Sequence, residues 1–174
     1  MFTKRARILV TGLFVVLFAV ILYFKVYQLA AVALMFIVIL VWGYFKQGPI
    51  VLAAKHFHNK DYFGAERLLK EVSRPEWLSK RRRGFYEFIY GGICLQKKEY
   101  DEAEKHYEIA AQYPLRSAND HVAALVHVAN INVRNGNYEK ARAYLQLTEK
   151  HRDNITAKMK DVIQRVEQEL KKNK

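Results

Sequence analysis

The chain has 174 residues, about half of them apolar, and a formal net charge of +12. This length allows one modest domain and an additional segment, and the single cysteine, Cys94, excludes an intrachain disulfide. Charge is unevenly distributed, because residues 8–45 carry only Lys25 whereas every Asp and Glu lies after residue 60. The sequence therefore divides into an apolar amino-terminal part and a charged remainder.

Two uncharged apolar runs, residues 8–24 and 29–45, fill the amino-terminal part. As helices, each would be about 26 Å long, close to the roughly 30 Å of a bilayer core. We therefore expect residues 1–47 to form a transmembrane helical hairpin. One alternative is a cleaved signal peptide, whose apolar stretch would be shorter. Another is a buried hairpin without a membrane, in which a polar face would be expected.

Basic residues predict the orientation of this hairpin. The turn between the runs holds only Lys25, and the other basic residues flank the two outer ends: Lys4, Arg5, Arg7, Lys46, Lys55 and Lys60. The positive-inside rule then places both termini and the following domain in the cytoplasm. The expected localisation is that of an integral protein of a bacterial cytoplasmic (inner) membrane.

The charged remainder contains an internal repeat. A Tyr-x-x-Ala pair recurs at intervals of 38 residues, and each pair has a small residue twelve positions before its alanine and a large apolar residue four positions after it. The three sets are Ala53, Tyr62, Ala65 and Leu69; Gly91, Tyr100, Ala103 and Tyr107; and Ala129, Tyr138, Ala141 and Leu145. Periods of this size indicate stacked helical repeats that bury a shared core.

This pattern resembles the tetratricopeptide repeat (TPR) family, whose unit is a helix–turn–helix with a small residue in helix A and an Ala-x3-aromatic pattern in helix B. The resemblance implies an all-α fold: the hairpin, a short α-solenoid of about three helix pairs, and a capping helix. The repeats are expected at about 48–74, 75–114 and 115–151, with a capping helix and basic tail at 152–174. Each interval exceeds the family's 34 residues by four, so we expect a longer second helix A that begins at Pro75. A coiled-coil partner is the alternative use of the last helix.

In TPR proteins helix A lines the concave surface, so the resemblance implies a partner-binding groove here. Its residues would be Phe57, Phe85, Phe88, Asn130, Val133 and Arg134. Because these are mostly apolar or aromatic, an extended or helical apolar peptide is a more plausible partner than a carboxyl terminus. Alternatively, three repeats are too few for a groove, and the aromatic side chains pack together.

The densest run of positive charge follows Trp77 and consists of Lys80, Arg81, Arg82 and Arg83. Beside a bilayer, such a run would attract anionic lipid headgroups. Nucleic acid is a second candidate, although no nucleic-acid-binding motif accompanies the charge. A plain solvated helix face is the alternative without a ligand.

No catalytic motif is recognisable: the chain has no phosphate-binding loop, HExxH, nucleophile elbow or CxxC pair. We therefore predict a non-enzymatic protein without cofactor or metal. The predicted function is a membrane-anchored adaptor that recruits or holds a partner protein at the cytoplasmic face. The alternatives are a structural subunit that packs in a membrane complex through its hairpin, and a basic lipid- or nucleic-acid-binding membrane protein.

Overall fold

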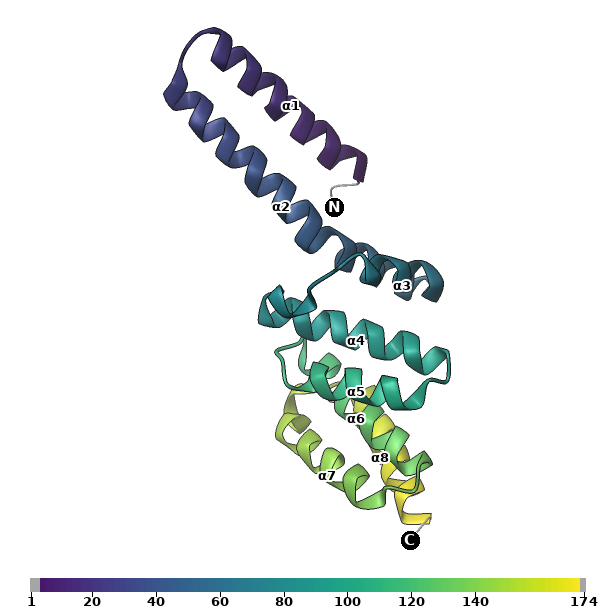
Figure 1. Cartoon of the computed structure of the whole chain (residues 1–174). Helices are drawn as coiled ribbons and strands as arrows, with labels where there is room; N and C mark the ends of the chain where they lie inside the picture. The colour runs from purple at the N-terminus through teal and green to yellow at the C-terminus, as the bar shows by residue number, and fades with distance from the viewer. Residues whose placement is uncertain (1–3, 173–174) are drawn as a thin grey trace. The chain divides into compact units, whose positions relative to one another are not determined.

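The structure, a computed structural model, describes residues 4–172. Within this range the regular secondary structure is helical and contains no strand, in agreement with the predicted all-α class and consistent with a TPR solenoid (Figure 1). The chain divides into two compact units, Met1–Val51 and Leu52–Lys174, and the boundary lies inside helix α2. The two units are described separately below.

The first unit consists of α1 (Lys4–Tyr23) and the first part of α2 (Tyr27–His58). The turn between them contains Lys25 with a positive φ of 56°. Ala30 and Ala33 are buried between the helices, and the rings of Phe14 and Phe36 lie 5.9 Å apart. A helical hairpin is therefore present, as the two apolar runs predict.

The prediction that this hairpin spans a membrane is wrong. Among the described residues, no helix combines the length and the apolar character that crossing a bilayer requires. Each apolar run, residues 8–24 and 29–45, is shorter than the roughly 20 residues of a typical span. In addition, α2 does not end with its run but continues through Pro49 to His58. The same finding contradicts the predicted integral-membrane localisation.

The second unit holds the end of α2 and six further α-helices. These are α3 (Tyr62–Lys70), α4 (Lys80–Gln96), α5 (Tyr100–Ala111), α6 (Ala118–Arg134), α7 (Tyr138–Thr148) and α8 (Ala157–Lys172), with 3-10 helices η1 (Pro75–Trp77) and η2 (Glu149–Asn154). From α3 to α7 each α-helix packs on the next, and α8 packs on α6 and α7. This order of antiparallel neighbours is visible in Figure 1.

Helix α4 begins later than the sequence predicts. Pro75 opens the short helix η1, and Leu78 then takes an extended conformation with ψ 150° before α4 starts at Lys80. Leu78 is buried, so this extended residue is held by packing. The extra residues of the repeat are therefore used in a 3-10 turn and an extended connection instead of an additional α-helical turn.

Small residues of the repeat lie where helices approach most closely. Ala53, Ala65, Ala103, Ala129 and Ala141 are all fully buried. In the second repeat Gly91 takes this role, since a Cβ atom there would lie 3.1 Å from the ring of Tyr107. The 38-residue pattern thus reflects the spacing of helix contacts in the core.

Helix α8 covers the end of the array within the same chain. Ile163, Val166 and Leu170 join a core cluster with Val122 and Leu145 of the preceding helix pair. The start of α8 is fixed by the backbone N–H of Thr156, which donates to Asn119 Oδ1 at 3.0 Å. The apolar stripe of the last helix is therefore used for packing inside the chain.

Candidate partner-binding surface

A row of aromatic side chains connects the three repeats of the second unit. We use the name aromatic row for Phe57, Phe88, Tyr107 and His127. The ring centroid of Phe88 on α4 lies 5.7 Å from that of Tyr107 on α5. The ring of His127 on α6 stacks on the same Tyr107 ring, with 4.6 Å between centroids. Phe57 covers Gly92, where a Cβ atom would lie 2.5 Å from the Phe57 ring. Tyr107 is buried, whereas the other three members are partly exposed.

The residues predicted to line a groove occupy different environments. Phe85 and Asn130 are half-buried, and Arg134 is exposed with its guanidinium 4.4 Å from the centre of the Tyr100 ring. Phe88 belongs to the aromatic row and packs against the core. Val133 is buried in the cluster that α8 completes. Phe85, Asn130 and Arg134 therefore offer the more accessible surface, and Val133 contributes to packing.

A buried ion cluster fixes α4 to α5. Glu87 is 1% exposed, and its carboxylate accepts from Arg83 Nη2 at 2.7 Å, while its second oxygen lies 2.5 Å from His106 Nδ1. The His106 ring stacks on Tyr90 at 4.5 Å. Burial raises the pKa of Tyr86, which lies beside Arg83, to about 12. Because its charges are paired and shielded from water, this cluster is a structural element.

A second polar network joins α5 to the third repeat. Glu104 Oε1 accepts from Asn132 Nδ2 at 2.7 Å and from Lys140 Nζ at 2.5 Å. Glu108 Oε1 accepts from the same ammonium at 2.8 Å and from Tyr144 Oη at 2.9 Å. These carboxylates raise the pKa of Lys140. The network therefore fixes the angle between neighbouring repeats with charge-assisted hydrogen bonds.

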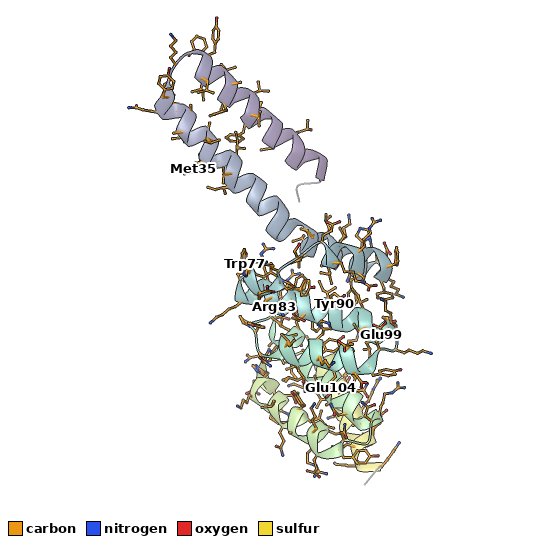
Figure 2. The ribbon with its side chains drawn as sticks, in the orientation of Figure 1. Met35, Trp77, Arg83, Tyr90, Glu99 and Glu104 are labelled. Carbon is orange, nitrogen blue, oxygen red and sulfur yellow. The ribbon has the colours of Figure 1, made fainter. Side chains whose placement is uncertain are left out.

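The predicted basic run is divided by the structure. Arg83 faces Glu87, whereas Lys80 and Arg81 are exposed and Arg82 is half-buried. Figure 2 shows Trp77 and Arg83 at the end of α4 where the helix begins. Trp77 is 63% exposed. Only part of the run is thus available to a ligand.

Two titratable groups of the core have strongly shifted pKa values. Burial raises the pKa of the Cys94 thiol to about 11, so it stays protonated at neutral pH. Burial also lowers the pKa of His127 to about 4, so the imidazole in the aromatic row is neutral. Within residues 4–172, no cluster of three or more His, Cys, Asp or Glu side chains is arranged to hold a metal.

Sequence reasoning missed three contributors to these surfaces. His127 belongs to no motif of the sequence, and its stacking on Tyr107 joins two different helices. Glu87 lies four residues after Arg83, and this spacing on a helix could have indicated the ion pair. Arg74, whose guanidinium lies 4.5 Å from the Trp77 ring, precedes Pro75 outside the basic run.

The comparisons with known proteins agree with this architecture. A family model described as the SusR N-terminal TPR domain matches residues 46–164. No curated protein and no solved structure matches the chain. TPR domains are protein-interaction repeats, generally without enzymatic activity, which indicates an adaptor role. Since the match covers more than half of the chain, this protein belongs to the TPR family described by the SusR N-terminal TPR domain.

Proposed function

We propose that the second unit holds a partner protein through the accessible side chains of α4 and α6 that border the aromatic row. The observation that supports this is the partial exposure of Phe85 and Phe88 on α4 and of Asn130 on α6, the two helices whose Phe88 and His127 pack on the buried Tyr107. Aromatic side chains on fixed elements bury a large apolar area at low entropic cost. An apolar segment of a partner, extended or helical, is the chemistry that fits them.

The fixed angle between repeats favours the same proposal. The ammonium of Lys140 links Glu104 and Glu108 of α5 to α7, and Asn132 links Glu104 to α6. A surface whose helices do not move on binding loses less entropy when a partner docks. Adaptor function requires this pre-organisation and no chemical step.

Phe85→Lys tests the proposal, with Phe63→Lys as the matched control. Phe85 is half-buried beside the aromatic row, whereas Phe63 lies on α3 and is 78% exposed. We expect Phe85→Lys to weaken partner binding by about tenfold or more, because a buried ammonium would lose hydration against an apolar segment. The measurement is quantitative mass spectrometry of proteins captured by tagged full-length chains, followed by titration of the purified partner.

The control variant separates loss of the surface from loss of fold. The proposal predicts that the parent and Phe63→Lys capture the same partner and that Phe85→Lys loses it. The helical circular dichroism of the two variants should equal that of the parent. If folded Phe85→Lys captures the same partners with the same affinity as the parent, the surface on α4 and α6 is not the binding site.

A further inference from the structure

The connection between the first and second repeats carries the most concentrated unpaired positive charge of the described structure. Residues 74–83 contain five cations and one acidic residue, Glu76. Of these cations, Arg83 is committed to Glu87. We use the name basic–tryptophan patch for the other four cations together with the indole: Arg74, Trp77, Lys80, Arg81 and Arg82.

The cations of the patch lie close together in the sequence and have no counter-charge. Across residues 4–172, no carboxylate lies within ion-pair distance of Arg74, Lys80, Arg81 or Arg82. Cations on other helices of the unit do have partners, for example Lys97 with Glu66 at 2.6 Å. Similar ion pairs hold Lys70, Lys105, Lys140, Arg142 and Arg152. The patch is therefore a local run of cations that no carboxylate of the described residues compensates.

The position of the patch adds to its positive potential. Lys80, Arg81 and Arg82 occupy the first turn of α4, the positive end of the helix dipole, where basic side chains are unfavourable and acidic ones are preferred. The side chain of Ser79 makes no capping hydrogen bond there. The positive side chains and the positive end of the helix dipole repel each other, and an acidic ligand would relieve this repulsion.

We infer that the basic–tryptophan patch binds a short acidic segment of a protein partner that also carries an aromatic or aliphatic side chain. Arginine and lysine would pair with its carboxylates. Trp77, held from one side by the Arg74 guanidinium at 4.5 Å and 63% exposed, would bury the apolar side chain. The patch spans one 3-10 turn and one α-helical turn, which suits a few residues of extended peptide. The patch shares no residue with the aromatic row or with Phe85 and Asn130, so this inference does not rest on the site proposed above.

The test is fluorescence anisotropy with the full-length chain, in non-ionic detergent to cover the exposed apolar side chains of α1 and α2. The probe is a labelled peptide, Glu-Asp-Glu-Phe-Glu-Asp-Glu-Glu, beside a counterpart with Gln and Asn in place of Glu and Asp. We expect Lys80→Gln with Arg81→Gln to weaken binding about tenfold, and Trp77→Ala about fivefold. The matched control is Lys158→Gln with Lys160→Gln, two exposed lysines on α8, which we expect to change affinity less than about twofold.

Three results would overturn the inference. In the first, the patch and control variants lose affinity equally, so that only net charge acts. In the second, the neutral peptide binds as tightly as the acidic one. In the third, a single-stranded oligonucleotide of eight nucleotides binds more tightly than the peptide and depends on the same residues, so that the ligand is nucleic acid.

Raising salt from about 0.1 M to about 1 M shortens the Debye length from about 10 Å to about 3 Å and should release the acidic peptide.

Discussion

Replacing Glu87 with alanine is expected to lower the free energy of unfolding by roughly 3–5 kcal/mol, the usual cost of removing one partner from a buried ion pair. The carboxylate is the common acceptor for Arg83 and His106, and its side chain is 2% exposed. Without it, the Arg83 guanidinium, whose Nε already lacks a hydrogen-bond partner, would stay in a low-dielectric site. Urea unfolding monitored by helical circular dichroism measures the loss.

The control for this variant is Glu102→Ala. Glu102 pairs with Lys105 at 2.7 Å on the same helix, α5, but its side chain is 55% exposed. Exposed pairs contribute little to stability because water screens the charges, so we expect a much smaller change. Equal destabilisation by the two variants would show that the buried cluster does not fix α4 to α5.

Replacing Tyr107 with alanine is the second large effect, again roughly 3–5 kcal/mol, because a buried aromatic side chain would be replaced by a cavity. The Tyr107 ring is in contact with Gly91, Phe88 and His127, and thus joins α4, α5 and α6. The same variant should also weaken partner binding, since Phe88 and His127 would lose the surface on which they rest. Unfolding curves and the capture assay measure the two effects separately.

Two substitutions control for this result. Tyr107→Phe keeps the ring and should cost no more than about 1.5 kcal/mol, while Phe63→Ala removes an aromatic side chain that is 78% exposed and should cost within about 0.5 kcal/mol. If Tyr107→Ala were as stable as Phe63→Ala, the aromatic row would not be part of the core.

The repeat architecture could be predicted from the sequence because its signal is local. Tyr62, Tyr100 and Tyr138 each begin a helix, α3, α5 and α7, at the 38-residue spacing read from the sequence. The small residues of the pattern are buried because helices can approach closely only at such positions. Periodicity and residue size are properties of a single helix, so a sequence records them directly.

Other features depend on contacts between distant segments and could not be predicted. Val133 has the position of a groove residue, but Ile163 and Val166 of α8, about 30 residues further along, join it in one core cluster. The Arg83–Glu87 pair has i, i+4 spacing on one helix, but His106 of α5, which completes the buried cluster, lies beside Glu87 only in the folded chain. Local pattern cannot decide which face of a helix a later helix covers.

The membrane prediction failed for a different reason. It relied on the apolar composition of residues 8–24 and 29–45, each at the lower limit of length for a span. In the structure the second run is part of a longer helix that includes Pro49 and ends at His58. The composition of a run does not determine where its helix begins and ends.

Photo-crosslinking tests the adaptor surface most directly. A photoreactive phenylalanine analogue would replace Phe85 on α4 or Asn130 on α6 and, in control chains, the exposed Lys105 on α5 or Glu139 on α7. The adaptor proposal predicts that one partner protein crosslinks from positions 85 and 130, and that Phe88→Lys or Phe85→Lys abolishes the adduct at position 130. Crosslinks that form from positions 105 and 139, with none from 85 and 130, would contradict it.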